Sequence, residues 1–194
     1  MLYLISDIHG DVMSFRKMLK KISFDPAVDN MIVMGDIFDW NDEGIPLLEF
    51  MSDYLVDDQM KLHGYLAHLP HCIEIESPKY GNCVVTHSGI HCGSYIRNVD
   101  RSINITESIK NAVKRDEYRF LISPDIHNVP FADKKAFDRY VFCGHVTTSR
   151  LNEDHSYNVY KTPYYMDLDC GNGERYRGGK LACYCVDENS AIYV

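Results

Sequence analysis

Short apolar runs that end in polar residues alternate along this chain with stretches of helical periodicity. The clearest helical stretch places Phe15, Met18, Leu19 and Ile22 at i, i+3, i+4 and i+7, which is the spacing of an amphipathic helix. The same reading predicts three helices, over residues 11–22, 44–55 and 106–121. Candidate N-caps are Asp11 or Ser14 for the first helix and Asn104 or Thr106 for the third.

Strands are predicted where apolar runs are short and bounded by turn residues. Residues 72–76 alternate with a period of two, as in a half-exposed strand, and pair with the apolar run 83–86 as a hairpin. A second hairpin turns at Glu188-Asn189. The full set of predicted strands is 3–8, 31–36, 72–76, 83–86, 140–143, 165–168, 181–186 and 191–194. With no internal repeat and no linker-like segment, we expect an α/β fold and one domain over residues 1–194.

Four of these strands end in an Asp or a His. Asp7 and His9 lie at the carboxyl end of the first strand, Asp36 ends the second, His87 follows the strand 83–86, and His145 follows the strand 140–143. Ligands bind at the carboxyl ends of strands in open α/β sheets. Five Asp and His side chains converging on one rim therefore predict a centre for two divalent metal ions.

Composition narrows the class of protein. The 194 residues include 45% hydrophobic and 25% charged residues, which is ordinary for a globular domain. The net charge of −8 disfavours nucleic acid as a partner, although a metal pair would reverse the field locally. We expect no membrane partner, because no apolar run approaches the roughly 20 residues that a spanning helix needs. Seven cysteines, an odd number, and no recognisable signal peptide favour a cytoplasmic protein.

The motifs together resemble the calcineurin-like metallophosphoesterases. These motifs are Asp7-x-His9-Gly10, Gly35-Asp36-x-x-Asp39, a strand that ends in His87, and Gly144-His145. They are most similar to the phosphoprotein phosphatase branch, which includes small bacterial and phage serine/threonine phosphatases and symmetrical dinucleoside tetraphosphatases. The resemblance implies a four-layer αββα sandwich of two mixed sheets.

The resemblance also implies roles for these residues. Asp7 and His9 would hold a first metal ion, Asp36 would bridge two ions, and His87 and His145 would hold the second. Manganese is the preferred ion, with iron and zinc as alternatives. Ions about 4 Å apart would ionise a bridging water for in-line attack on phosphorus. Asp39 would orient a general-acid histidine.

Two departures from the family pattern bear on activity. Trp40 stands where the family has an arginine that grips phosphate. The family's Gly-Asn-His-Glu/Asp block, which supplies a ligand and the general acid, is absent. His63 is the nearest substitute for the acid, with His68 and His71 nearby. Arg115 is the candidate for a second phosphate-binding arginine. The alternatives to Arg115 are Arg97, Arg101 and Arg119.

The sequence therefore predicts a metal-dependent phosphoesterase of the serine/threonine phosphatase type. Its expected substrate is a phosphorylated protein or a small phosphoester, and the sequence does not define an oligomeric state. A lost general acid costs about 10²–10⁴-fold in rate and less for good leaving groups, so activated phenyl phosphates should be hydrolysed best. Two alternatives stay open: a dinucleoside polyphosphate hydrolase, and a pseudophosphatase that binds phosphate or a partner protein.

Overall fold

The structure is a computed structural model that describes residues 1–39, 42–55, 69–123 and 125–194. Its helices are α1 (Val12–Lys21), α2 (Gly44–Leu55), α4 (Ile105–Ile122), α5 (Asp125–Asn128) and α6 (Phe131–Lys134), with short 3₁₀ turns η1 (Cys92–Ser94), η2 (Thr148–Arg150) and η3 (Asn172–Arg177). Its strands are β1 (Leu2–Ile5), β2 (Asn30–Val33), β3 (Cys72–Ser77), β4 (Gly81–Thr86), β5 (Ile96–Arg97), β6 (Ile103–Asn104), β7 (Tyr140–Cys143), β8 (Tyr160–Lys161), β9 (Tyr165–Asp167), β10 (Ala182–Cys185) and β11 (Ser190–Tyr193).

Two mixed sheets form the centre of the fold. The first has the order β11-β10-β1-β2, in which β1 and β2 are parallel and the other pairs antiparallel. The second has the order β3-β4-β7-β9-β8, in which β4, β7 and β9 are parallel. The hairpins predicted over 72–86 and 181–194 are both present. The short pair β5-β6 forms a separate ribbon.

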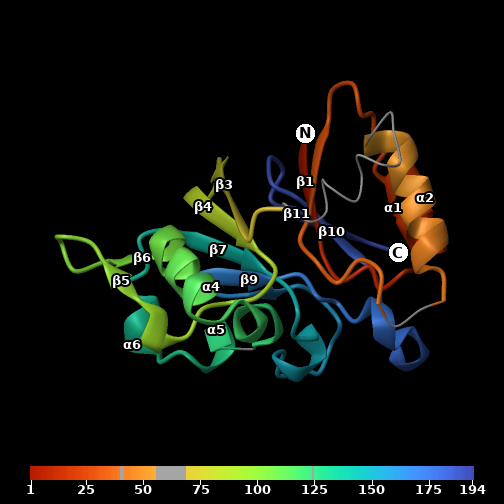
Figure 1. The fold of residues 1–194 in the computed structure, drawn as a ribbon. Helices are drawn as coiled ribbons and strands as arrows, with labels where there is room; N and C mark the ends of the chain where they lie inside the picture. Colours follow the sequence, from red (N-terminus) through yellow and green to blue (C-terminus); the bar gives the residue numbers. More distant parts are fainter. Residues whose placement is uncertain (40–41, 56–68, 124) are drawn as a thin grey trace.

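Helices cover the outer face of each sheet, and the two inner faces pack on each other. Along β1, Tyr3 and Ile5 pack with α1 and α2, whereas Leu4 points into the layer between the sheets. Along β7, Val141 packs with α4 and α5, whereas Phe142 joins Leu4 in the inner layer. Figure 1 shows α1 and α2 on one side and α4, α5 and α6 on the other. The expected αββα sandwich is confirmed, and the continuous apolar runs of these strands are explained by burial on both faces.

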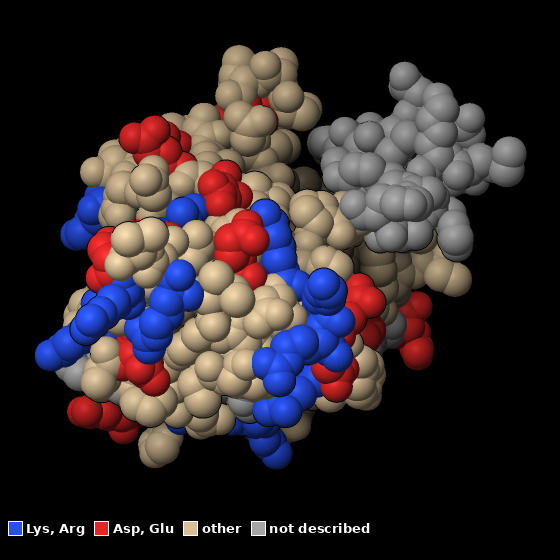
Figure 2. All heavy atoms as spheres, turned by 60° about the vertical axis from the view of Figure 1, so that its left-hand side comes forward, with Lys and Arg blue, Asp and Glu red and all other residues tan. Residues whose placement is uncertain are grey.

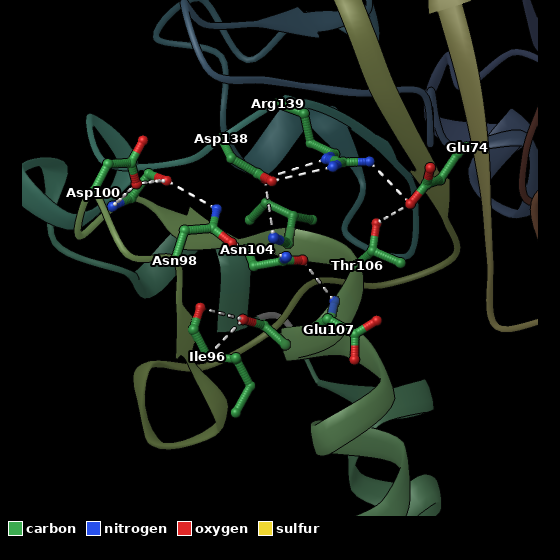
Figure 3. Close-up of polar contacts among 12 residues, drawn as sticks. Glu74, Ile96, Asn98, Asp100, Asn104, Thr106, Glu107, Asp138 and Arg139 are labelled. Carbon is green, nitrogen blue, oxygen red and sulfur yellow. Dashed lines mark hydrogen bonds and ion pairs between the residues drawn. The ribbon is translucent and has the colours of Figure 1, made fainter.

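The helix starts are fixed by side-chain caps. Asp11 accepts a hydrogen bond from the Ser14 amide at the start of α1, and Asn104 accepts one from the Glu107 amide at the start of α4. Figure 3 shows how the second start is anchored, with Asp138 accepting from the Ile105 amide. In both helices the first of the two predicted caps is the one used.

Arg139 ties the same region together. It pairs with Asp138 and with Glu74 of β3, and Glu74 also accepts a hydrogen bond from Thr106 (Figure 3). On the face of the molecule drawn in Figure 2, Lys and Arg gather in groups separated by Asp and Glu. The face therefore presents no large field of one sign.

Most differences from the predicted elements lie at their ends. The first two strands stop at Ile5 and Val33, earlier than predicted, because the chain then leaves the sheet to place Asp7 and Asp36. The third helix extends to Ile122 but is interrupted at Asp116, whose φ and ψ are not helical.

Within the described residues no helix is long and apolar enough to span a membrane. All seven cysteines are free thiols.

Candidate metal centre

The loops after β1 and β2 lie side by side and carry three of the predicted ligands. The amide of His9 donates to the carbonyl of Asp36 at 2.8 Å, and the amide of Asp7 donates to Gly35 at 3.2 Å. Side-chain atoms of Asp7, His9 and Asp36 lie within 4.8 Å of one another. The parallel pairing of β1 and β2 therefore brings the first two motifs together.

The tips of β4 and β7 carry the other two predicted ligands. The carbonyl of His87 accepts a hydrogen bond from Gly144 at 2.8 Å, so the two tips are also joined. The imidazole rings of His87 and His145 lie 5.0 Å apart, edge to face. His87 Nε2 is 3.4 Å from Asp36 Oδ1, and His145 Nδ1 is 3.9 Å from Asp36 Oδ2. These three residues form a second cluster within 4.8 Å.

Four of the five residues hold a backbone conformation that side chains disfavour. The φ angles of Asp7, His9, Asp36 and His145 are 54°, 52°, 41° and 74°. Such left-handed residues cost about 1–3 kcal/mol each and gather where function requires a fixed geometry. The hydrogen bonds between the tips stabilise this geometry, including those from the His145 amide to both carboxylate oxygens of Asp7 at 3.2 Å.

The donor set fits a pair of divalent cations. Asp36 belongs to both clusters, so it is placed to bridge two ions while the others each face one. His87 Nδ1 and His145 Nδ1 are buried without a hydrogen-bond partner in the described residues. Carboxylate oxygens with imidazole nitrogens suit manganese, iron and zinc alike. The structure brings together all five predicted ligands, and their metal-binding role stays a prediction.

Burial makes the carboxylates of this centre electrostatically costly. Asp7 is only 1% exposed, and its pKa is raised well above the ordinary value by burial, with a further increase from Asp169. Asp36 is less buried and its pKa is lowered, because His145, His87 and His9 offset the cost of desolvation. In turn, Asp36 raises the pKa of His145. Without a cation the buried Asp7 therefore favours its neutral form, and a cation nearby would favour the ionised form.

Asp169 is a member of this acidic group that the sequence reading did not select. It is buried, and its carboxylate accepts hydrogen bonds from the Gly171 amide and the Thr147 hydroxyl. Burial and the charge of Asp167 raise its pKa to about 6. A signal was present in the sequence, because Asp167 and Asp169 end an apolar strand as Asp7 and His9 do.

These raised pKa values predict an unusual pH dependence for the metal-free protein. A carboxyl whose folded pKa is raised stabilises the fold below its ordinary pKa of 3.8, and this stabilisation is lost as the pH rises through about 6. In chelator, the melting temperature should therefore fall as the pH rises across this window. Manganese should remove the fall, because bound ions favour ionised Asp7. A chelated protein that gains stability across the window would contradict this assignment.

Asp39 contacts a predicted ligand directly. Its Oδ1 lies 3.0 Å from His9 Nδ1, so a proton on Nδ1 leaves Nε2 as the nitrogen that can bind metal. This contact was not foreseen, since the sequence reading assigned Asp39 to a general-acid histidine. That histidine, His63, lies outside the described residues together with His68 and Trp40, so their roles stay predictions.

Asp39→Asn should weaken metal binding without unfolding the protein. A carboxylate that orients a ligating histidine typically contributes 10–100-fold in affinity, and we expect a loss of about this size. Competition with a fluorescent chelator would measure it. Asp154→Asn, an exposed change of the same charge, is the control. Equal affinities for the two variants would show that Asp39 does not support His9.

The remaining candidates lie on or near α4. His71 bonds to Glu117 at 2.8 Å, which commits its ring to the surface of the helix. Arg97 bonds to the Arg101 carbonyl and lies 3.8 Å from Asp133, within the β5-β6 region. Arg115 is exposed and donates to the Gly93 carbonyl. Of the four candidate arginines, Arg115 and Arg119 line a cavity.

That cavity lies beside the His87 tip. Its volume is about 210 Å³, and its wall includes Gly89, Ile90 and His91, which follow His87 along the chain. Arg115 and Arg119 of α4 form another part of the wall. The Ser88 hydroxyl bonds to the Phe120 carbonyl and so fixes α4 against this loop. The wall also includes Asp116, so the recess carries two arginines and one carboxylate next to the loop that follows His87.

The two mixed sheets between helices are consistent with a metallophosphoesterase-like sandwich fold. The chain is similar to the crystal structure of a "putative diadenosine tetraphosphatase", with a TM-score of 0.65 and 16% identity over 100% of this chain and 92% of that one. Identity this low shows the shared fold alone. No protein-family model and no curated protein sequence matches the chain.

Proposed function

We propose that this protein is a metal-dependent phosphoesterase. The observation that carries the proposal is the sharing of Asp36 between two three-residue clusters at the tips of four strands. A pair of divalent ions in such an arrangement supplies Lewis acidity and activates water for attack on phosphorus. The backbone strain at Asp7, His9, Asp36 and His145 supports a functional centre rather than an accidental group of polar residues.

The predicted residues would have separate roles in metal binding and in phosphate binding. Asp7 and His9 would hold one ion, His87 and His145 would hold the other, and Asp36 would be shared by both. The hydrogen bonds between the strand tips keep these side chains in place before substrate arrives. Arg115 and Arg119, which line the cavity that begins two residues after His87, would bind phosphate oxygens beyond the reacting group.

Phosphomonoesters with good leaving groups are the substrate class that the sequence favours. The family's Asn-His block is missing, so proton delivery to a poor leaving group such as a serine alkoxide would be weak. An aryl or phosphate leaving group needs little help. Hydrolysis of a phosphorylated protein is therefore expected to be slower than hydrolysis of an activated phenyl phosphate.

Dinucleoside polyphosphates are a second candidate class, and two observations favour them. The wall of the cavity that follows His87 carries two arginines alongside Asp116, and two arginines suit a substrate with several phosphates in a row. The similar solved structure is described as that of a putative diadenosine tetraphosphatase. A phosphoanhydride also has a good leaving group, in keeping with the missing acid.

The test compares three substrates under one set of conditions. Turnover of p-nitrophenyl phosphate, a phosphoserine peptide and diadenosine tetraphosphate would be measured with manganese and after chelation. Metal-dependent turnover of the first substrate is expected, and preference between the other two assigns the class. If no substrate is turned over while the protein still binds metal, the enzyme proposal fails and a pseudophosphatase remains.

A further inference from the structure

A third group of ligand-type side chains lies inside the protein, behind the rim residues, and its Asp167 interacts electrostatically with Asp7 and His87. His127 of α5, Cys143 of β7 and Asp167 of β9 place one nitrogen, one sulfur and one oxygen within 4.8 Å of one another. Cys143 and Asp167 are fully buried, and the His127 side chain is only 8% exposed. None of the three belongs to either cluster that shares Asp36.

The distances in this group match a tetrahedral zinc site. His127 Nε2 lies 3.1 Å from Asp167 Oδ2, and Cys143 Sγ lies 3.8 Å from the same oxygen. With typical zinc bond lengths of about 2.0–2.3 Å, tetrahedral ligands stand roughly 3.4–3.6 Å apart. The distances from Asp167 Oδ2 to the other two atoms are therefore close to those between ligands of one small ion.

The His127 ring is oriented as a ligand rather than as a hydrogen-bond donor. Although Nε2 is 3.1 Å from Asp167, it is buried and has no hydrogen-bond partner of acceptable geometry in the described residues. Nδ1 lies 3.1 Å from the Tyr165 hydroxyl. A proton on Nδ1 would leave the Nε2 lone pair facing a carboxylate oxygen, and a cation between them would stabilise this arrangement.

Asp167 is arranged in the same way. Its Oδ1 accepts a hydrogen bond from the Asp169 amide at 2.8 Å, so Oδ2 is the oxygen turned toward His127 and Cys143. Outer contacts of this kind, Tyr165 on the histidine and a backbone amide on the carboxylate, are typical of ligated residues.

We propose that His127, Cys143 and Asp167 bind a zinc ion that is separate from the rim centre. The thiol sulfur selects zinc over manganese, and metal binding would release the Cys143 proton. Three protein ligands leave a fourth position for water. The ion would fasten α5 to β7 and β9 (Figure 1). Through Ile126, which packs against Gly89, it would also support the loop after His87.

Cobalt substitution tests this site independently of activity. The rim centre offers only oxygen and nitrogen, so a thiolate-to-cobalt charge-transfer absorption can come only from a cysteine-containing site. We expect the cobalt-loaded protein to show this absorption. It should also bind one metal equivalent more than its Cys143→Ala variant.

Matched variants separate this cysteine from the others. Cys183→Ala removes another fully buried thiol, and Cys92→Ala removes an exposed one, and both should keep the absorption. His127→Gln should lose it, and this variant decides the test if Cys143→Ala fails to fold. Absence of the absorption in the wild-type protein, or its survival in both His127→Gln and Cys143→Ala, would overturn the proposal.

Discussion

Asp36→Asn is expected to abolish metal-dependent phosphoester hydrolysis. Removal of one preorganised electrostatic contact costs about 10²–10³-fold in rate, and Asp36 contributes to both clusters, so the loss should be at least about 10³-fold. Asparagine is the informative replacement because it tolerates the left-handed conformation, here φ 41°, that Asp36 adopts. The fold should therefore survive while the bridging charge is lost.

Steady-state turnover and metal content together would measure this effect. Asp154→Asn is the control, since it makes the same chemical change on an exposed residue. It should leave turnover and metal content unchanged. Wild-type turnover by Asp36→Asn with both ions retained would mean that the two clusters do not share a bridging carboxylate.

Gly144→Ala should have the second-largest effect, on stability and metal binding at once. A β-carbon at this position would overlap the Ser6 hydroxyl and Asp7 Oδ2. Overpacking of this kind costs about 1–3 kcal/mol of unfolding free energy. Displacement of Asp7 would also weaken the first cluster, because the Asp7 carboxylate would lose the hydrogen bond that it accepts from the His145 amide. Denaturant unfolding and metal titration would report the two losses.

Gly81→Ala provides the matched control. Gly81 has a φ of 68°, so alanine is strained there, but nothing lies within 4 Å of the added carbon. This variant should lose stability and keep its metal affinity. If Gly144→Ala behaves in the same way, the close approach of Gly144 to Asp7 has no bearing on the centre.

The rim could be predicted from the sequence because its signals are local. Each predicted ligand directly follows a short apolar run, and parallel neighbours bring such ends to one edge, as β1 and β2 do for Asp7 and Asp36. The helix caps were also readable, because Asp11 and Asn104 act on amides only three residues away. Such local chemistry needs no knowledge of the whole fold.

What could not be predicted depends on contacts between distant segments. The pairing of Asp39 with His9 spans 30 residues and requires the two loops to be placed first. The group of His127, Cys143 and Asp167 joins α5, β7 and β9. Each of its members alone resembles an ordinary buried side chain. The break in α4 at Asp116 is a similar case, since the apolar pattern continues across it.

The candidate metal centre lies where the two sheets meet. Asp7, His9 and Asp36 come from the sheet of β1 and β2, whereas His87 and His145 come from the sheet of β4 and β7. The reach from Asp36 to the histidines is therefore set by how thick the interlayer is, and that thickness is set by side chains such as Leu4 and Phe142. The buried core therefore sets the distance between the two groups of predicted ligands. A core substitution that removes one methylene can change this distance without contacting any ligand.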